Sequence, residues 1–237
     1  MKTFTRKKAL GNFYSRGIFI TFSYLVACVL FFSVSISGQT ANQCRTPKNE
    51  QIYAAETLLA NLGYWIVRID CSRDDSTRQA IIAFQKAEGL KRTGVLTAKL
   101  LNALRKASRP LPKYSGARHI EIDISRQLLF LVDEEGAVER ILPVSTGNEK
   151  KYFEQGKWRI AHTPRGTFAI ERKITGVRRA PLGNLYNPNY FYGGVAIHGS
   201  NSVPVYPASH GCVRIPRFAD PEFSRLVKVG MPVYVYD

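Results

Sequence analysis

The stretch His119-Ile120-Glu121-Ile122-Asp123-Ile124 alternates apolar and polar side chains, which is typical of a β-strand with one buried face. Gln127 to Val132 continues as a second strand, and Asp133-Glu134-Glu135-Gly136 has the composition of a hairpin turn. Further strands are expected at residues 138–144, 166–173, 195–198, 212–215 and 233–236, with one helix at 220–227. This half of the chain is therefore predicted to be mainly β, either a sandwich or a partly closed barrel.

Upstream of this region the apolar spacing has a helical period. One stripe at spacing i, i+3, i+4, i+7 consists of Ala55, Leu58, Leu59 and Leu62. Gly63 ends that helix, a second is expected after the polar cluster at residues 74–77, and a third from Thr97. Three short helices in about 60 residues form a core that is only marginally stable alone. The predicted fold class is therefore α+β, with a small three-helix domain before the β domain.

The stiff segment Arg109-Pro110-Leu111-Pro112 separates the two halves. The expected organisation is an export segment at 1–38, a tether at 39–49, the helical domain at 50–107, a linker at 108–117 and the β domain at 118–237.

The first residues predict export. Five basic residues and no acid precede an apolar run from Gly17 to Ile36, and small residues follow at 35–38. A signal peptide cut near Ser37 explains this layout. A retained anchor at 17–36 with its basic end inside explains it too, since a spanning helix needs about 20 residues. A third reading is a lipoprotein box at Leu25-Val26-Ala27-Cys28, although apolar residues continue beyond it. Each reading places the body outside the cytoplasm, in the periplasm or cell wall.

The body is basic in its own right. The chain has 34 Lys and Arg against 18 Asp and Glu, a net charge of +16, and 16 − 5 = +11 remains without the five basic residues before the apolar run. Such a charge favours a polyanionic neighbour, for example an anionic wall polymer or a membrane surface. Nucleic acid is disfavoured by export, and no platform of arginines and aromatic residues requires it.

Three cysteines lie beyond the export segment: Cys44, Cys71 and Cys212. In an oxidising compartment an odd number suggests one free thiol. Cys44 and Cys71 flank the first predicted helix and can pair, which leaves Cys212; the alternative is three buried thiols. A Cys44–Cys71 bridge would stabilise the small domain by about 2–4 kcal/mol.

Cys212 begins one predicted strand and His198 ends another. A thiol with an ordinary pKa near 8.5 needs a base or a cationic neighbour to become a nucleophile. If the two strands are neighbours, His198 meets Cys212 and can act as that base. Gly211 lets a substrate approach the backbone, and the amides of Gly211 and Cys212 can stabilise an oxyanion. His210 either donates to that oxyanion or shapes the turn.

Two other interpretations of these residues stay open. Cys212 can be a small core residue, and His198, His210 and Cys212 can be zinc ligands. The irregular spacing and the lack of an obvious fourth ligand argue against zinc, so neither a metal nor a cofactor is expected.

Two segments together resemble the signature of the L,D-transpeptidase (YkuD-type) catalytic domain. They are Ser209-His210-Gly211-Cys212-Val213-Arg214 and, before it in the chain, Ala196-Ile197-His198-Gly199. The similarity runs from about Arg118 to Tyr236. It includes the segments 125–127, 145–147, 163–168 and 193–194. The resemblance implies a β-rich fold and a ping-pong acyl transfer on peptidoglycan stem peptides, with the terminal D-amino acid expelled and a 3→3 crosslink formed.

The resemblance also implies roles. Cys212 is the nucleophile, His198 is the base and later the acid, the carbonyl of Gly199 orients that histidine, and His210 and Gly211 serve the oxyanion.

Four further residues are candidates for substrate binding. Arg214 can hold a substrate carboxylate in a two-pronged hydrogen bond, or simply carry charge at the cleft rim. Tyr190 and Tyr192 belong to the aromatic stretch 186–192, which can wall the stem-peptide groove. Ser209 is expected to fix the turn beside Cys212 rather than to react.

The helical half resembles the three-helix peptidoglycan-binding domain. The similarity rests on Asn61-Leu62-Gly63-Tyr64, on Ala83-Phe84-Gln85-Lys86 and Gly89-Leu90, and on Thr93-Gly94-Val95-Leu96-Thr97. The loop Asp70-Cys71-Ser72-Arg73 departs from the family pattern, so this domain either binds glycan or serves as a spacer.

Three functions follow from these patterns. The first is an L,D-transpeptidase with peptidoglycan as both donor and amine acceptor. The second keeps the cysteine and histidine but transfers the acyl group to water, which makes a peptidase. The third is a wall-binding protein without catalysis.

Overall fold

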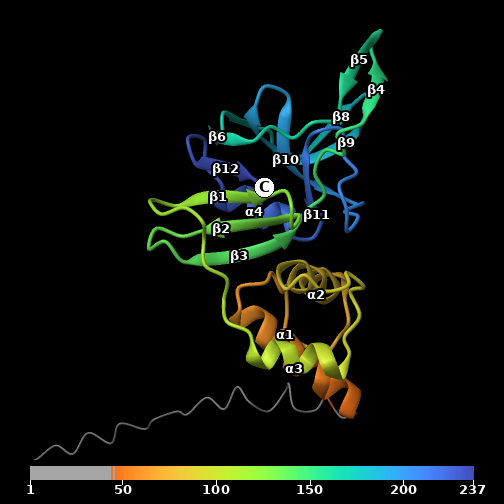
Figure 1. Cartoon of the computed structure of the whole chain (residues 1–237), viewed down its shortest axis with the longest axis vertical. Coiled ribbons are helices and arrows are strands. Elements are labelled where there is room, and N and C mark those ends of the chain that lie inside the picture. Colours follow the sequence, from red (N-terminus) through yellow and green to blue (C-terminus); the bar gives the residue numbers. More distant parts are fainter. Residues whose placement is uncertain (1–43, 45) are drawn as a thin grey trace, which may run out of the picture. The chain divides into compact units, whose positions relative to one another are not determined.

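The computed structural model of the chain describes residue 44 and residues 46–237 (Figure 1). All described residues belong to one compact unit, and residues 1–36 are not part of it. That segment, with the predicted signal peptide or anchor, lies outside the described residues, as does most of the expected tether. No helix within the described part is long and apolar enough to cross a membrane.

The first half contains the three expected helices: α1 (Pro47–Asn61), α2 (Asp75–Ala87) and α3 (Ala98–Lys106). Each begins after a polar residue whose side chain accepts a backbone N–H of the first turn: Thr46 for α1, Asp74 for α2 and Thr97 for α3. Helix α1 begins inside the expected tether, because Thr46 caps it and Pro47 suits a first helical position.

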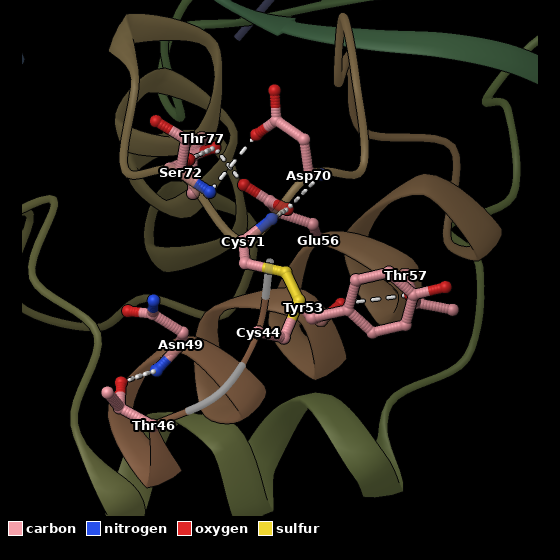
Figure 2. Close-up of a disulfide and its surroundings, with 10 residues drawn as sticks. All are labelled: Cys44, Thr46, Asn49, Tyr53, Glu56, Thr57, Asp70, Cys71, Ser72 and Thr77. Atoms are coloured by element: carbon pink, nitrogen blue, oxygen red, sulfur yellow. Dashed lines mark hydrogen bonds between the residues drawn. A yellow bond between two sulfur atoms is a disulfide. The ribbon is translucent and has the colours of Figure 1, made fainter. Parts of the chain in front are cut away.

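A disulfide joins Cys44 to Cys71, with their Cα atoms 5.8 Å apart (Figure 2). Beside it, the buried carboxylate of Glu56 accepts hydrogen bonds from the amides of Asp70 and Cys71 and from the hydroxyl of Thr77. Burial raises the pKa of Glu56, and these three donors oppose that rise. The loop before α2 is thus tied to α1 both covalently and through one carboxylate.

The second half contains two main sheets. The first has the order β3-β2-β1-β12-β6. Its strands are β1 (His119–Asp123), β2 (Leu128–Val132), β3 (Val138–Pro143), β6 (Gly166–Ala169) and β12 (Pro232–Tyr236). All neighbours are antiparallel except β1 and β12, which are parallel.

The second sheet has the order β11-β10-β9-β7, and β8 also pairs with β9. Its strands are β7 (Arg172–Lys173), β8 (Val177–Ala180), β9 (Gly183–Tyr192), β10 (Val195–Ser200) and β11 (Val213–Pro216). A separate hairpin consists of β4 (Lys151–Glu154) and β5 (Lys157–Ile160), and one helix, α4 (Asp220–Leu226), precedes β12. The predicted α+β class is confirmed; both main sheets are open in order, so the β half is a sandwich rather than a barrel.

The first sheet is buried on both faces. Along β2, Leu129 and Leu131 belong to a core shared with the second sheet, whereas Leu128 and Phe130 belong to a core shared with the helices. Successive side chains of a strand point to opposite faces, so alternate residues divide between the two cores. The helical core also takes residues from α1, α2 and α3, among them Leu59, Ala83, Phe84 and Leu104. The predicted small domain therefore shares its core with the sheet.

Candidate active site

His198 lies on β10, and Cys212 directly precedes the neighbouring strand β11. β10 and β11 are parallel, with Ile197 opposite Val213 and His198 opposite Arg214. Because side chains alternate along a strand, His198, Arg214 and Cys212 share one face of the sheet. All three line a single cleft of about 680 Å³. The pairing of the two strands thus brings both residues to one cleft.

His198 is oriented by its own chain. Its Nδ1 donates to the carbonyl oxygen of Gly199 at 2.9 Å, which leaves Nε2 with a lone pair. Burial lowers the pKa of His198 to about 4, and the positive charge of Arg214 adds to that effect, while the Gly199 carbonyl opposes it. The imidazole is therefore neutral at neutral pH and can accept a proton.

Cys212 is half-buried and lines the cleft. Burial raises the pKa of the Cys212 thiol, whereas the Ala196 amide and the charge of Arg214 oppose that rise. The Sγ atom lies 3.9 Å from the carbonyl oxygen of Gly194. At neutral pH the pair is thus a protonated thiol beside a neutral imidazole, rather than an ion pair.

The turn before Cys212 is held by Ser209. This buried side chain donates to the carbonyl oxygen of Cys212 and accepts the amide of Gly211 at 3.0 Å. Gly211 has a φ of +135°, and a Cβ there would lie 2.8 Å from the carbonyl oxygen of His162, so only glycine fits. Because Ser209 holds the Gly211 amide, that amide is not available to an oxyanion in this structure, which departs from the expected role of Gly211.

The segment leading away from β3 supports this turn. Ser145 exchanges two backbone hydrogen bonds with Arg214, at 3.1 and 3.0 Å. The carbonyl oxygen of Thr146 accepts the amides of Ala208 and Ser209. The side chain of Gln127 in turn binds both the amide and the hydroxyl of Thr146. Residues 145 and 146 therefore fix both ends of the cysteine-bearing turn.

Lys86 connects the helical domain to the same segment. Its side chain is 1% exposed, and its Nζ donates to the carbonyl oxygens of Val144 at 2.8 Å and Gln127 at 3.1 Å. Burial lowers the pKa of Lys86 to about 7, and the charge of Arg92 adds to that effect. A helix of the first domain thus contacts the segment that supports the cysteine turn.

Asp220 supports the histidine from the other side. This buried carboxylate accepts the amide of Gly199 at 3.0 Å and the side-chain amide of Asn187 at 2.6 Å. A Cβ on Gly199 would lie 2.7 Å from the nearer oxygen of Asp220, so the strand can approach the carboxylate only as glycine. The residue that orients His198 is therefore itself held in place.

Of the remaining residues that were expected at the site, His210 and Tyr190 line the cleft and Tyr192 does not. His210 is exposed at the cleft, with its ring 4.6 Å from that of Tyr152. Tyr190 is buried and lines the cleft. Tyr192 does not line it; that side chain is 52% exposed and packs against Phe168, because the register of β9 against β10 shifts between Tyr190 and Tyr192 and interrupts the regular alternation. The expectation that Tyr192 walls the groove therefore does not hold here.

Sequence reasoning missed many residues that line the cleft, among them Tyr152, Arg172 and Arg178. Tyr152 comes from the β4–β5 hairpin, and the two arginines come from β7 and β8. The two arginines reach Tyr190 because β7 and β8 pair with β9. No local pattern in the sequence indicates that pairing. Only the basic composition of the chain hinted at cations near the site.

Among the residues that the structure describes, no set of three or more His, Cys, Asp or Glu side chains converges as metal ligands would. His198, His210 and Cys212 share the cleft without forming such a set.

Two models of known protein families match the sequence of this chain. Residues 117–235 match the sequence model of the L,D-transpeptidase catalytic domain (YkuD), and residues 48–104 match that of a peptidoglycan binding domain. No match is found among curated proteins.

Solved structures show the same likeness. An L,D-transpeptidase from Xylanimonas cellulosilytica is 40% identical, with a TM-score of 0.75 over 78% of this chain and 93% of that one. One from Stackebrandtia nassauensis is 21% identical, with a TM-score of 0.47 over 79% and 91% of the two chains. One from Mycobacterium smegmatis is 23% identical, with a TM-score of 0.42 over 52% and 60%. The family model covers half of the chain, and the first relative is 40% identical over more than two thirds of it, so the chain belongs to the L,D-transpeptidase (YkuD) family.

Proposed function

We propose that the protein is a peptidoglycan L,D-transpeptidase that works through a thioester on Cys212. The observation that carries this proposal is the bond from His198 Nδ1 to the Gly199 carbonyl, because it leaves the lone pair on Nε2 of a side chain that lines the same cleft as Cys212. Family membership supports the reaction class, and the matched peptidoglycan binding domain supports peptidoglycan as the substrate.

In the first half-reaction the thiol sulfur of Cys212 attacks the carbonyl carbon at the L-centre of a donor stem peptide. Nε2 of His198 takes the thiol proton, and the carbonyl oxygen becomes an oxyanion. The tetrahedral intermediate collapses with cleavage of the C–N bond. The departing D-amino acid takes the proton from His198, which leaves a thioester on Cys212 and a neutral imidazole.

In the second half-reaction an amine from a neighbouring stem attacks the thioester carbon. His198 accepts the proton of the attacking nitrogen, the C–S bond breaks, and the sulfur recovers a proton to restore the thiol. The new amide is a 3→3 crosslink. We assign the Cys212 amide and His210 to the oxyanion, since the Gly211 amide is bound to Ser209.

The protonation states favour coupling of proton transfer to attack. A raised Cys212 pKa and a His198 pKa of about 4 disfavour a resting thiolate–imidazolium pair. The thiol is therefore inert until an electrophilic carbonyl is in place, which limits its side reactions in an oxidising compartment.

We also propose that the protein is exported to the periplasm or cell wall and that its helical domain holds it on peptidoglycan. Export rests on residues 1–38 of the sequence. A tethered enzyme meets a higher local concentration of stem peptides without any new contact at the active site.

Two measurements test the proposal. Intact-mass analysis after incubation with a carbapenem is expected to show one covalent adduct, absent in Cys212→Ala. Incubation with a disaccharide-tetrapeptide is then expected to give crosslinked dimers. Folded protein without any adduct would contradict a reactive thiol, trimmed monomers alone would indicate hydrolysis, and binding to sacculi without either product would indicate a wall-binding protein.

A further inference from the structure

The charges that line the catalytic cleft are unbalanced. Among its lining residues within the described part of the chain, four are arginines and one is an acid. The acid, Glu154, is paired with Arg159 at 3.4 Å. The other three guanidinium groups, of Arg172, Arg178 and Arg214, take part in no ion pair within the described residues. The cleft therefore presents a positive surface with no internal counter-ion.

Two of these arginines share one aromatic support. The guanidinium carbon of Arg172 lies 4.1 Å from the ring centre of Tyr190, and that of Arg178 lies 5.8 Å from it. The pairing of the strands sets this arrangement, since β7 and β8 both pair with β9 and Arg172 lies opposite Tyr190. A guanidinium that rests a face on a ring keeps its N–H donors in its own plane, free for another acceptor.

Arg214 is engaged differently. Its charge acts on the pKa values of both Cys212 and His198, so it lies at the reacting end of the cleft. Arg172 and Arg178 appear in neither of those effects, and both side chains are exposed. Their strands, β7 and β8, pair with β9 and with neither β10 nor β11, so the two arginines lie in the part of the cleft away from Cys212.

We infer that Arg172 and Arg178 bind a side carboxylate of the donor stem peptide, so that the enzyme selects stems whose side carboxyl groups are free over stems in which they are amidated. This inference rests on the proposed function. A carboxylate offers two acceptor oxygens that match the planar fork of a guanidinium. A carboxamide offers one oxygen and an NH₂ group whose donors would face the donors of arginine. Amidation thus removes both the charge and half of the acceptors.

The test uses the full chain and two synthetic tetrapeptide donors that differ only in side carboxylate against carboxamide. The formation of the Cys212 thioester is followed by mass spectrometry, and kcat/KM is compared between donors. The wild type is expected to favour the free carboxylate by about tenfold, which corresponds to about 1.4 kcal/mol. The preference should shrink as salt is raised from 0.05 to 0.5 M, because exposed charges are screened.

Variants identify the residues responsible. In Arg172→Gln/Arg178→Gln the ratio of kcat/KM values is expected to fall to within about twofold of unity. Arg172→Lys/Arg178→Lys keeps the charge but loses the fork, and should retain part of the preference. Arg225→Gln removes an exposed arginine of α4 that does not line the cleft, and should retain the wild-type ratio. Carbapenem acylation and thermal unfolding show that each variant is folded.

The outcomes separate this inference from the proposal beneath it. A wild-type ratio at or below one, or a preference that persists in the double glutamine variant, overturns the role of Arg172 and Arg178 and leaves the transpeptidase intact. A protein that takes the carbapenem but neither peptide overturns the choice of substrate, and with it this inference. A protein that takes none of the three lacks the reactive thiol itself.

Discussion

The ammonium nitrogen of Lys86 lies 2.8 Å from the carbonyl oxygen of Val144, so a buried charge of the helical domain rests on the segment that supports the cysteine turn. The same nitrogen also donates to Gln127, whose side chain holds Thr146. A positive charge in this position is disfavoured by burial and is compensated only by carbonyl dipoles, which is why its pKa falls to about 7.

The first prediction concerns how stability depends on pH. Above about pH 7 the folded protein releases the Lys86 proton, whereas the unfolded chain keeps it up to about pH 10.4. The unfolded state then binds more protons, so stability rises with pH across this window, by up to about 1.4 kcal/mol per unit. Urea unfolding between pH 7 and 9 should show this rise in the wild type and a flatter curve in Lys86→Met.

Lys99→Met is the matched control, because Lys99 is exposed on α3 and keeps an ordinary environment. Its curve should follow that of the wild type. Parallel curves for wild type and Lys86→Met would show that the buried lysine does not titrate in this range.

The second prediction concerns the acid limb of catalysis. Since the pKa of His198 is about 4, the imidazole remains neutral as pH falls from 8 to 5. The rate of Cys212 acylation by a carbapenem is therefore expected to lose its His198-dependent part only near pH 4. In His198→Gln the rate should be low at pH 7 and should rise toward alkaline pH, as the thiol ionises without help. A wild-type inflection near pH 6.5 would indicate an exposed histidine as the base.

The third prediction concerns the contact between β10 and α4. In Gly199→Ala the new methyl group would press on the carboxylate of Asp220, which accepts the Gly199 amide. We expect a loss of about 1–3 kcal/mol in the free energy of unfolding. Acylation should slow by about tenfold or more, because the carbonyl that orients His198 moves with the strand.

Gly194→Ala is the control for this steric effect, since a Cβ there meets no atom within 4 Å. That variant should unfold close to the wild type. Equal stability of the two alanine variants would mean that Asp220 and α4 shift to make room for the methyl group with no loss in the free energy of unfolding.

The fourth prediction concerns the disulfide. The bridge spans 27 residues, so its loss frees a loop of the unfolded chain and should lower stability by about 2–4 kcal/mol. Reductant is expected to lower the melting temperature of the wild type but not that of Cys44→Ser/Cys71→Ser. The carbapenem adduct on Cys212 should still form in that variant at a temperature where it is folded. If the folded variant failed to form the adduct, the disulfide would be required for the reactivity of Cys212.

Local patterns predicted much of the fold. The helical stripe at 55–62 faces a core, and such one-sided burial leaves a periodic signal in the sequence. The alternation at residues 119–124 also marked a strand, although β1 is buried on both faces and its polar side chains are buried too. Strand β9 was missed because Asn187-Pro188-Asn189 carries turn-forming residues, and Asn187 indeed has a φ of +40° inside the strand. The β4–β5 hairpin was missed because its side chains are largely exposed, so no apolar alternation marks it.

The candidate site was likewise predictable from the sequence only in part. Cys212 and His198 could be singled out from the sequence because each adjoins a short apolar segment and has a glycine beside it, although His198 lies inside β10 and Cys212 just before β11. Arg172 and Arg178 were not, since only the pairing of β7 and β8 with β9 brings them to Tyr190. Lys86 follows an apolar stripe and would ordinarily be a solvated lysine; its burial arises from the packing of α2 against the sheet, which has no sequence signal.

The sheet β3-β2-β1-β12-β6 packs apolar side chains on both of its faces, so its folding depends on the helices as well as on the second sheet. Removing residues 44–107 would expose to solvent five apolar side chains that pack with the helices: Leu128, Phe130, Val132, Val138 and Ile141. Because they share this core, we expect the two regions recognised by separate family models to unfold together, as one calorimetric transition. A chimera that carries a foreign binding domain would need to rebuild that apolar face before its catalytic half could fold.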